Sequence, residues 1–256
     1  MRITRSFIPN LFTLANLFSG FTALIYISMG DYHRAAAFIL FAAVFDMLDG
    51  IVARIFKATS ELGAELDSLC DAVSFGVAPA YMLYHLYFYH LGQMGILLAS
   101  LPALAGVLRL ARFNVMTVSF DDKEYFTGMP IPASALTIVS YVIFFHLKPD
   151  IPYDYKTILV YAVTFLTSAS MVSKIKFDNL PRPTKKSYRK RPIASIVFVL
   201  GLAASIITKG RFVFPFMLFY IFFSSIRHFI IWIKETREAA DEFDETEDFD
   251  ESQYNL

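Results

Sequence analysis

The feature that most constrains this chain is a succession of apolar runs that each last about twenty residues, the length that crosses a bilayer as a helix. A strand of a soluble protein is much shorter, and a helix of a soluble protein keeps a polar face at the helical period. Many of the runs here are apolar all round, and hydrophobic residues make up 56% of the 256 residues. These observations predict an all-α, polytopic transmembrane helical bundle.

The apolar runs predict about eight spanning helices. Turn or breaker residues separate them, for example at Gly30–Asp31 and Lys209–Gly210. An even number of spans places both termini on one side of the membrane. The predicted spans cover roughly 9–29, 34–56, 62–88, 93–116, 131–147, 156–173, 192–208 and 212–233.

The distribution of basic residues predicts the orientation. With the amino terminus in the cytoplasm, only five basic residues fall outside, and the remaining 18 of the 23 fall inside. Basic loops stay in the cytoplasm, so we expect an integral protein of the cell (inner) membrane with both termini cytoplasmic. The loop 174–191 is especially basic, which indicates a topology determinant or a site for anionic lipids. The five outer residues are Arg34, Lys148, Lys156, Lys209 and Arg211.

The carboxyl-terminal segment 235–256 differs from the rest, because it carries ten carboxylates and one Arg. Such a segment buries little apolar area, so we expect a disordered cytoplasmic tail. The sequence thus predicts a catalytic membrane domain over 1–177, a basic loop with two further spans over 178–234, and the tail. The membrane is the expected surrounding, and no nucleic-acid partner is expected.

Four aspartates occur where hydrocarbon-facing residues are expected. Asp46 and Asp49 stand near the end of one predicted helix, and Asp67 and Asp71 near the start of the next. Spacings of three and four residues place each pair on one helical face. Ionisable residues within spanning helices are costly and are functional by default. We therefore expect the four carboxylates to meet near the cytoplasmic surface and to form the active site.

Carboxylates brought together without a partner repel one another, so a cation must belong to such a site. Oxygen-only ligation favours Mg²⁺ or Mn²⁺ over Zn²⁺, and four aspartates can hold two such ions. Ions of this kind usually serve phosphate chemistry. Gly50 and Ala53, on the same face as Asp46 and Asp49, leave room for a nucleotide or for a neighbouring backbone.

The complete pattern, D-x-x-D-G-x-x-A-R-x8-G-x3-D-x3-D over residues 46–71, matches the signature of the CDP-alcohol phosphotransferase family at every position. The resemblance implies that Asp46, Asp49, Asp67 and Asp71 bind two divalent ions and that Asp71 is also the general base. It further implies that the CDP moiety is held by Asp49, Gly50, Ala53, Arg54 and Gly63.

Further stretches resemble the branch of this family whose acceptor alcohol is serine: 8–16, 65–76, 109–114, 128–133 and 171–173, so the resemblance covers roughly residues 6 to 177. It implies transfer of the phosphatidyl group of CDP-diacylglycerol to L-serine with release of CMP, by a homodimer. One alternative is a sister enzyme that accepts glycerol 3-phosphate or inositol phosphate. A cation transporter is the alternative from another class, although the aspartate set is not repeated along the chain.

Serine is a zwitterion, so its pocket needs a cation for the carboxylate and an acceptor for the ammonium. Arg109, Arg112 and Asn114, near the cytoplasmic end of a predicted span, are the candidates. The two arginines could instead anchor the helix end at lipid headgroups. A covalent route would need Ser68 or Ser74 as nucleophile, but neither stands beside an evident base, so direct displacement is favoured.

The remaining polar and aromatic residues of the predicted helices give no second site. The five histidines lack metal-ligand spacing and stand mostly near helix ends. The aromatic cluster from Tyr81 to Tyr89 is typical of a belt at the membrane interface.

Overall fold

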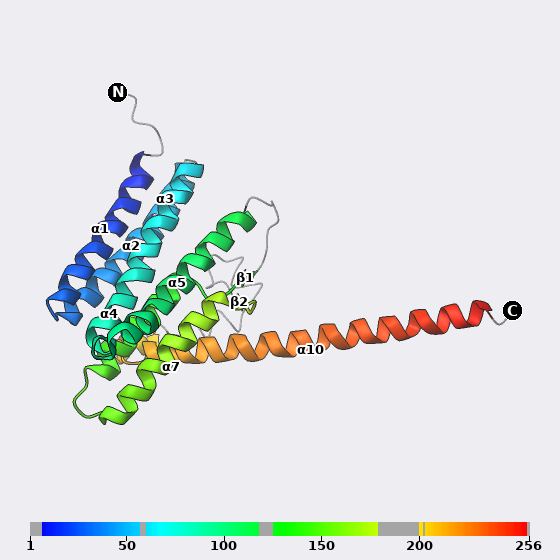
Figure 1. Cartoon of the computed structure of the whole chain (residues 1–256). Helices are drawn as coiled ribbons and strands as arrows, with labels where there is room; N and C mark the ends of the chain where they lie inside the picture. The colour runs from blue at the N-terminus through cyan, green and yellow to red at the C-terminus, as the bar shows by residue number, and fades with distance from the viewer. Residues whose placement is uncertain (1–6, 57–59, 118–124, 179–199, 202, 255–256) are drawn as a thin grey trace.

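The computed structural model describes residues 7–56, 60–117, 125–178, 200–201 and 203–254. Its helices pack into one bundle, with α1 and α2 forming an antiparallel hairpin at one side (Figure 1). α1 covers Phe7–Ser28 and α2 covers Tyr32–Ile55. Gly30, with a φ of 76°, makes the turn, and Asp31 caps α2 by accepting a hydrogen bond from the Arg34 amide at 3.0 Å.

The third crossing consists of three helical segments joined end to end: α3 (Glu61–Asp71), the π-helical turn η1 (Ala72–Val77) and α4 (Ala78–Leu86). Ser60 caps α3 by accepting from the Gly63 amide at 3.1 Å. Pro79 explains the wider turn, because its ring would clash with a carbonyl of the preceding turn in a regular α-helix. Asp71 therefore stands where the helix changes pitch.

The later helices complete the bundle. α5 packs against η1, α4 and α7, and α10 packs against α6. α10 also runs out beyond the other helices in Figure 1. These helices are η2 (Phe88–Leu91), α5 (Gly92–Thr117), α6 (Ile131–Tyr141), the π-helical η3 (Val142–His146), α7 (Tyr153–Val172) and α10 (Val213–Tyr254).

A short antiparallel ribbon joins the chain before α6 to the chain after α7. β1 (Tyr125–Thr127) pairs with β2 (Lys176–Asp178), and the Gly128 amide donates to the Ile175 carbonyl at 2.9 Å. Gly128 has a φ of 81°, and a side chain there would collide with the Met171 carbonyl. The all-α class is confirmed, and this ribbon is a small addition that the apolar pattern does not predict.

The predicted spans agree with the helices of the described residues. Five helices are long and apolar enough to cross a membrane: Ile8–Ser28, Tyr32–Ile55, Phe88–Val115, Tyr153–Val172 and Val213–Ile233. Glu61–Leu86 and the shorter Ile131–His146 correspond to the predictions for 62–88 and 131–147. The prediction for 192–208 lies mostly outside the described residues.

The acidic tail is a correction to the sequence analysis. Disorder is predicted for 235–256, but the structure continues α10 as a helix to Tyr254. The prediction considered only apolar burial, whereas a helix satisfies its own backbone groups without burial. Glu, which is frequent in this segment, also has high helix propensity.

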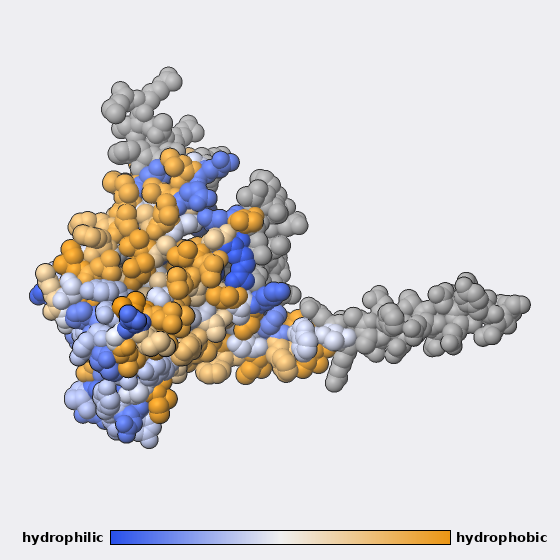
Figure 2. Space-filling model, in the orientation of Figure 1, coloured by the Kyte–Doolittle hydropathy of each residue, from blue (hydrophilic) through white to orange (hydrophobic). Residues whose placement is uncertain are grey.

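Large apolar side chains cover much of the outside of the bundle. Phe18, Phe21 and Leu104 are each more than half exposed. Hydrophobic residues occupy the middle of the face in Figure 2, and hydrophilic ones gather toward its upper right and its lower end. So large an exposed apolar surface is unfavourable in water, whereas it is what the hydrocarbon core of a bilayer requires of a protein. The chain is an integral membrane protein.

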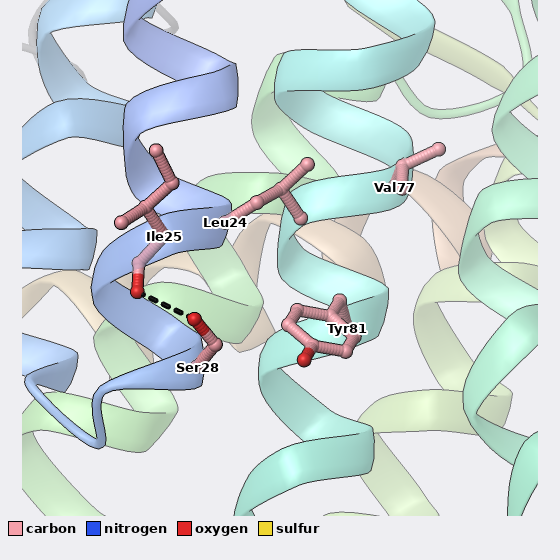
Figure 3. Close-up of a pocket in the computed structure, with 5 residues that line it drawn as sticks. All are labelled: Leu24, Ile25, Ser28, Val77 and Tyr81. Carbon is pink, nitrogen blue, oxygen red and sulfur yellow. Dashed lines mark hydrogen bonds between the residues drawn. The ribbon is translucent and has the colours of Figure 1, made fainter.

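One groove on this outer surface lies between α1 and α4 (Figure 3). Its volume is about 430 Å³, and its lining is mostly apolar, with Ser28 and Tyr81 as the residues that carry hydroxyl groups. The Ser28 hydroxyl donates to the carbonyl of Ile25 at 2.8 Å. Val77, which also lines the groove, lies six residues after Asp71 at the far end of η1, and the lining residues include none of the four aspartates. The groove is thus separate from the aspartates.

Candidate active site

Three of the four aspartates meet between α2 and α3. Each of Asp46, Asp49 and Asp67 offers a carboxylate oxygen, and these oxygens all lie within 4.8 Å of one another. The spacing of three residues on α2 directs Asp46 and Asp49 toward the same side, where Asp67 faces them from α3. The predicted convergence of these three residues is therefore present in the structure.

The donor set fits a hard divalent cation. Asp49 is 7% exposed, and its Oδ2 is buried without a hydrogen-bond partner among the described residues, as is Oδ1 of Asp67. A buried carboxylate oxygen without a donor costs free energy unless a cation compensates it. Oxygen-only ligands suit Mg²⁺ or Mn²⁺, which keep some coordination positions for water or substrate. The acidic cluster is thus compatible with metal binding.

Asp71 lies beside this group and has a different environment. It interacts electrostatically with Asp46 and Asp67, and its carboxylate Oδ1 accepts a hydrogen bond from Asn16 Nδ2 at 3.0 Å. Asp71 is 8% exposed, and Asn16 is fully buried. The sequence analysis did not select Asn16, although an amide within an apolar helix was an available signal. Asn16 on α1 and its partner Asp71 on α3 are 55 residues apart in the sequence.

The residues predicted to hold CDP follow the cluster toward the ends of α2 and α3. A side chain at Gly50 would meet only the Arg54 guanidinium, at 3.7 Å, so this face of α2 is open. Arg54 is exposed, and its Nε donates to the Gly50 carbonyl at 2.8 Å. Gly63 lies in the first turn of α3, and Ala53 is half-buried. Their binding of CDP stays a prediction.

The residues predicted to bind serine separate into two groups. Arg109, on α5, is 7% exposed and interacts electrostatically with Asp71, and its guanidinium lies 5.8 Å from the Phe113 ring centre. A lipid headgroup anchor would instead be exposed at the surface. The Arg112 Nη2 donates to the Val172 carbonyl at 2.9 Å, and the Asn114 amide is engaged with Ser68. Among the described contacts of these three residues, the electrostatic interaction of Arg109 with Asp71 is the one that involves an aspartate of the site.

The hydroxyls of the two serines considered as nucleophiles donate hydrogen bonds to neutral acceptors. The Ser68 hydroxyl donates to Asn114 Oδ1 at 3.2 Å, and the Ser74 hydroxyl donates to the Asn16 backbone carbonyl at 3.1 Å. An activated serine needs a general base at this position. These contacts favour a direct displacement over a covalent intermediate.

Fold and site together define a class, that of integral membrane proteins with a buried carboxylate cluster between helices of one bundle. Comparison with known proteins defines the family. The family model for CDP-alcohol phosphatidyltransferases matches residues 6–169, and the chain belongs to this family. The matched region includes all four aspartates and Arg109, and ends before α10.

Several curated relatives carry the name CDP-diacylglycerol–serine O-phosphatidyltransferase. The protein of Helicobacter pylori (strain 26695) is 31% identical over 229 residues, which cover 88% of this chain and 92% of the relative. That of Bacillus subtilis (strain 168) is 34% identical over 177 residues, covering 69% and 93%. That of Methanocaldococcus jannaschii is 32% identical over 216 residues, covering 84% and 91%.

Proposed function

We propose that this protein transfers the phosphatidyl group of CDP-diacylglycerol to the hydroxyl of L-serine, forming phosphatidylserine and releasing CMP. The observation that carries the proposal is the convergence of Asp46, Asp49 and Asp67 with Asp71 beside them, in a chain of the CDP-alcohol phosphatidyltransferase family. The name that the relatives share supports serine as the acceptor.

In this proposal Asp46, Asp49 and Asp67 hold divalent cations, Mg²⁺ or Mn²⁺, and Asp71 completes a site for two ions. The ions, when bound, neutralise the diphosphate of the lipid substrate. Asp71 takes the proton of the serine hydroxyl. The serine oxygen forms a bond to the lipid-side phosphorus, and the bond from that phosphorus to the CMP oxygen breaks. Gly50, Ala53, Arg54 and Gly63 hold the CDP moiety.

Arg109 binds the serine carboxylate in this proposal. Its burial beside Asp71 supports this role, because a guanidinium offers a carboxylate two parallel hydrogen bonds. Arg112 and Asn114 lie on the same helix end, but their side chains form hydrogen bonds with the Val172 carbonyl and with Ser68. We therefore place them in a supporting shell around the pocket.

The proposal also includes the orientation and the assembly. The excess of basic residues on one side of the predicted topology supports cytoplasmic termini and a cytoplasmic active site in the inner membrane. The family resemblance supports a homodimer. Cysteine labelling of the variants Ile3→Cys and Asp31→Cys in intact cells tests the orientation, and label is expected only at position 31. Light scattering in detergent tests the dimer.

The deciding experiment is an acceptor assay with purified protein, CDP-diacylglycerol and a divalent ion. We expect CMP release with L-serine and much slower release with ethanolamine, glycerol 3-phosphate or inositol phosphate. The two phosphate acceptors represent the sister enzymes, and they need additional cations for their own phosphate. Faster reaction with glycerol 3-phosphate would remove serine from the proposal and leave the phosphotransferase chemistry in place. Absence of CMP release with all acceptors would remove both.

A further inference from the structure

The side-chain amide of Asn16, buried at the site, has an oxygen atom that takes no part in the roles described so far. Asn16 Nδ2 donates to Asp71, but Asn16 Oδ1 is buried and has no hydrogen-bond partner among the described residues. An amide oxygen left in this state costs about 1–3 kcal/mol, so a protein retains it only where something compensates the cost. The oxygen lies next to the carboxylate that is proposed to deprotonate serine.

The position of Asn16 is fixed from two sides. The Ser74 hydroxyl donates to its backbone carbonyl at 3.1 Å, which ties α1 to η1. Gly20, one turn further along α1, allows this approach, because a Cβ there would lie 2.8 Å from the Ser74 Cα. α1 packs against both α2 and α3, and Thr13 on the same face of α1 contacts Asp49. This face of α1 is a third wall of the aspartate site.

Serine carries three groups on adjacent carbons, and three different partners are needed to recognise them. Asp71 takes the hydroxyl and Arg109 the carboxylate in the proposed function, which leaves the ammonium without a partner. An ammonium group is only a donor and requires an oxygen acceptor. Asn114 is less suited, because its amide oxygen accepts from Ser68 and its amide nitrogen donates to the same hydroxyl, at 3.2 and 3.1 Å.

We infer that Asn16 is a substrate-binding residue whose side-chain oxygen accepts a hydrogen bond from the ammonium group of the acceptor amino acid while its amide nitrogen holds Asp71 in place. The inference rests on the proposed function, since it requires an amino-alcohol acceptor at Asp71. It makes the first helix part of the acceptor pocket and assigns each polar group of serine to a separate helix: α1, α3 and α5.

The test uses two analogues that each lack one group of serine. Ethanolamine lacks the carboxylate, and 3-hydroxypropionate lacks the ammonium. Both are measured as competitors of L-serine, so that slow turnover does not hide their binding. Unmodified protein, Asn16→Leu and Ser19→Ala are compared. Leu has the same branched arrangement of side-chain heavy atoms as Asn. Ser19 is a matched control, because it is 2% exposed on α1 and its hydroxyl donates to the Ala15 carbonyl within the helix.

In the unmodified protein, serine should bind better than 3-hydroxypropionate by about tenfold or more, the effect of a buried polar partner left unmatched. Asn16→Leu should bring the ratio of the two affinities, serine over 3-hydroxypropionate, close to one. The affinity for 3-hydroxypropionate itself should stay within about threefold of that of the control Ser19→Ala. A loss of packing alone would weaken serine and 3-hydroxypropionate equally. An unchanged ratio in Asn16→Leu overturns the inference.

Turnover of Asn16→Leu can fall too far for competition measurements, because Asp71 loses its donor. The shift of the unfolding temperature by each ligand then gives the same comparison, since a ligand that binds the folded state raises it. Serine should stabilise the unmodified protein more than 3-hydroxypropionate does, and this difference should disappear in the variant. If the unmodified protein itself does not bind serine, the proposed function fails; if it does and the variant keeps the difference, only the inference fails.

Discussion

Two polar clusters lie within the apolar bundle, one at each end of the third crossing, and they differ in how their polar atoms are satisfied. Within the part of the chain that the structure describes, the aspartate end leaves buried oxygens of Asp49, Asp67 and Asn16 without hydrogen-bond partners. The opposite end lies around Tyr87 and Tyr141, and Tyr87 follows Asp67 by 20 residues, which is most of the length of the third crossing. Both clusters are buried, so burial alone does not separate them.

At the opposite end, side-chain hydrogen bonds pair the buried groups. The Tyr141 hydroxyl donates to the Lys156 carbonyl at 2.9 Å and lies 2.8 Å from His146 Nδ1. The Tyr87 hydroxyl donates to Thr157 Oγ1 at 3.2 Å. Satisfied groups of this kind stabilise the packing of α6, η3 and the residue that follows α4 against α7. Among the described residues, one buried hydroxyl without a partner also occurs elsewhere, at Ser134 on α6. Buried carboxylate oxygens without partners, and not polar residues in general, therefore distinguish the end of the bundle that is proposed to be catalytic.

The largest expected effect is at the carboxylate group itself. Asp46→Ala, Asp49→Ala or Asp67→Ala should each nearly abolish CMP release, because the remaining ligands no longer hold the divalent ions in position. EDTA should have the same effect, reversed by added Mg²⁺ or Mn²⁺. The variants should still unfold at a temperature close to that of the unmodified protein. Activity that persists after EDTA treatment and in all three variants contradicts the metal site.

Asp71→Asn should have the second largest effect on turnover. The amide keeps one oxygen for a cation but cannot accept the serine proton, so kcat should fall by about 10²–10⁴-fold. Binding of CDP-diacylglycerol should remain, which equilibrium binding of the labelled lipid measures. If lipid binding disappears as completely as in Asp46→Ala, then Asp71 acts mainly as a metal ligand and the general base is another residue.

A smaller effect is expected at Arg109. Loss of its pairing with the serine carboxylate is worth about 2–3 kcal/mol, or more than thirty-fold in the preference for serine over ethanolamine. Arg109→Leu should reduce this preference and raise the serine KM, with less change for CDP-diacylglycerol. Arg112→Leu is the matched control, because its guanidinium donates to the Val172 carbonyl. Equal losses in the two variants argue against a specific role for Arg109.

The aspartate site was largely predictable from the sequence, because helical spacing decides which residues share a face. Asp46 and Asp49 lie three residues apart, and Asp67 faces them, as the pattern predicts. The contribution of α1 was not predictable, because the hydrogen bond between Asn16 and Asp71 depends on how helices distant in sequence pack. Burial of Arg109 likewise depends on packing, so the sequence alone left its role divided between serine and lipid headgroups.

Long apolar runs also predicted the helices but not their irregularities. The π-helical turn η1 depends on Pro79, and the ribbon of β1 and β2 depends on a close approach at Gly128. Neither changes the hydrophobic pattern from which spans are read. The tail was predicted wrongly for a related reason, since helix formation by its Glu and Ala residues requires no apolar contact.

The smallest effect on activity is expected at the opposite cluster, where stability should change instead. Tyr141→Phe removes the hydroxyl that contacts His146 and the Lys156 carbonyl, and leaves those two partly buried groups without this partner. We expect a loss of about 1–3 kcal/mol in the free energy of unfolding, measured in detergent, and a serine turnover within about twofold of the unmodified protein. Tyr155→Phe, at a residue that is 62% exposed, is the control and should change neither quantity. A fall in turnover as large as that of Arg109→Leu, with stability preserved, means that this cluster takes part in catalysis and that paired hydrogen bonds do not distinguish the two ends.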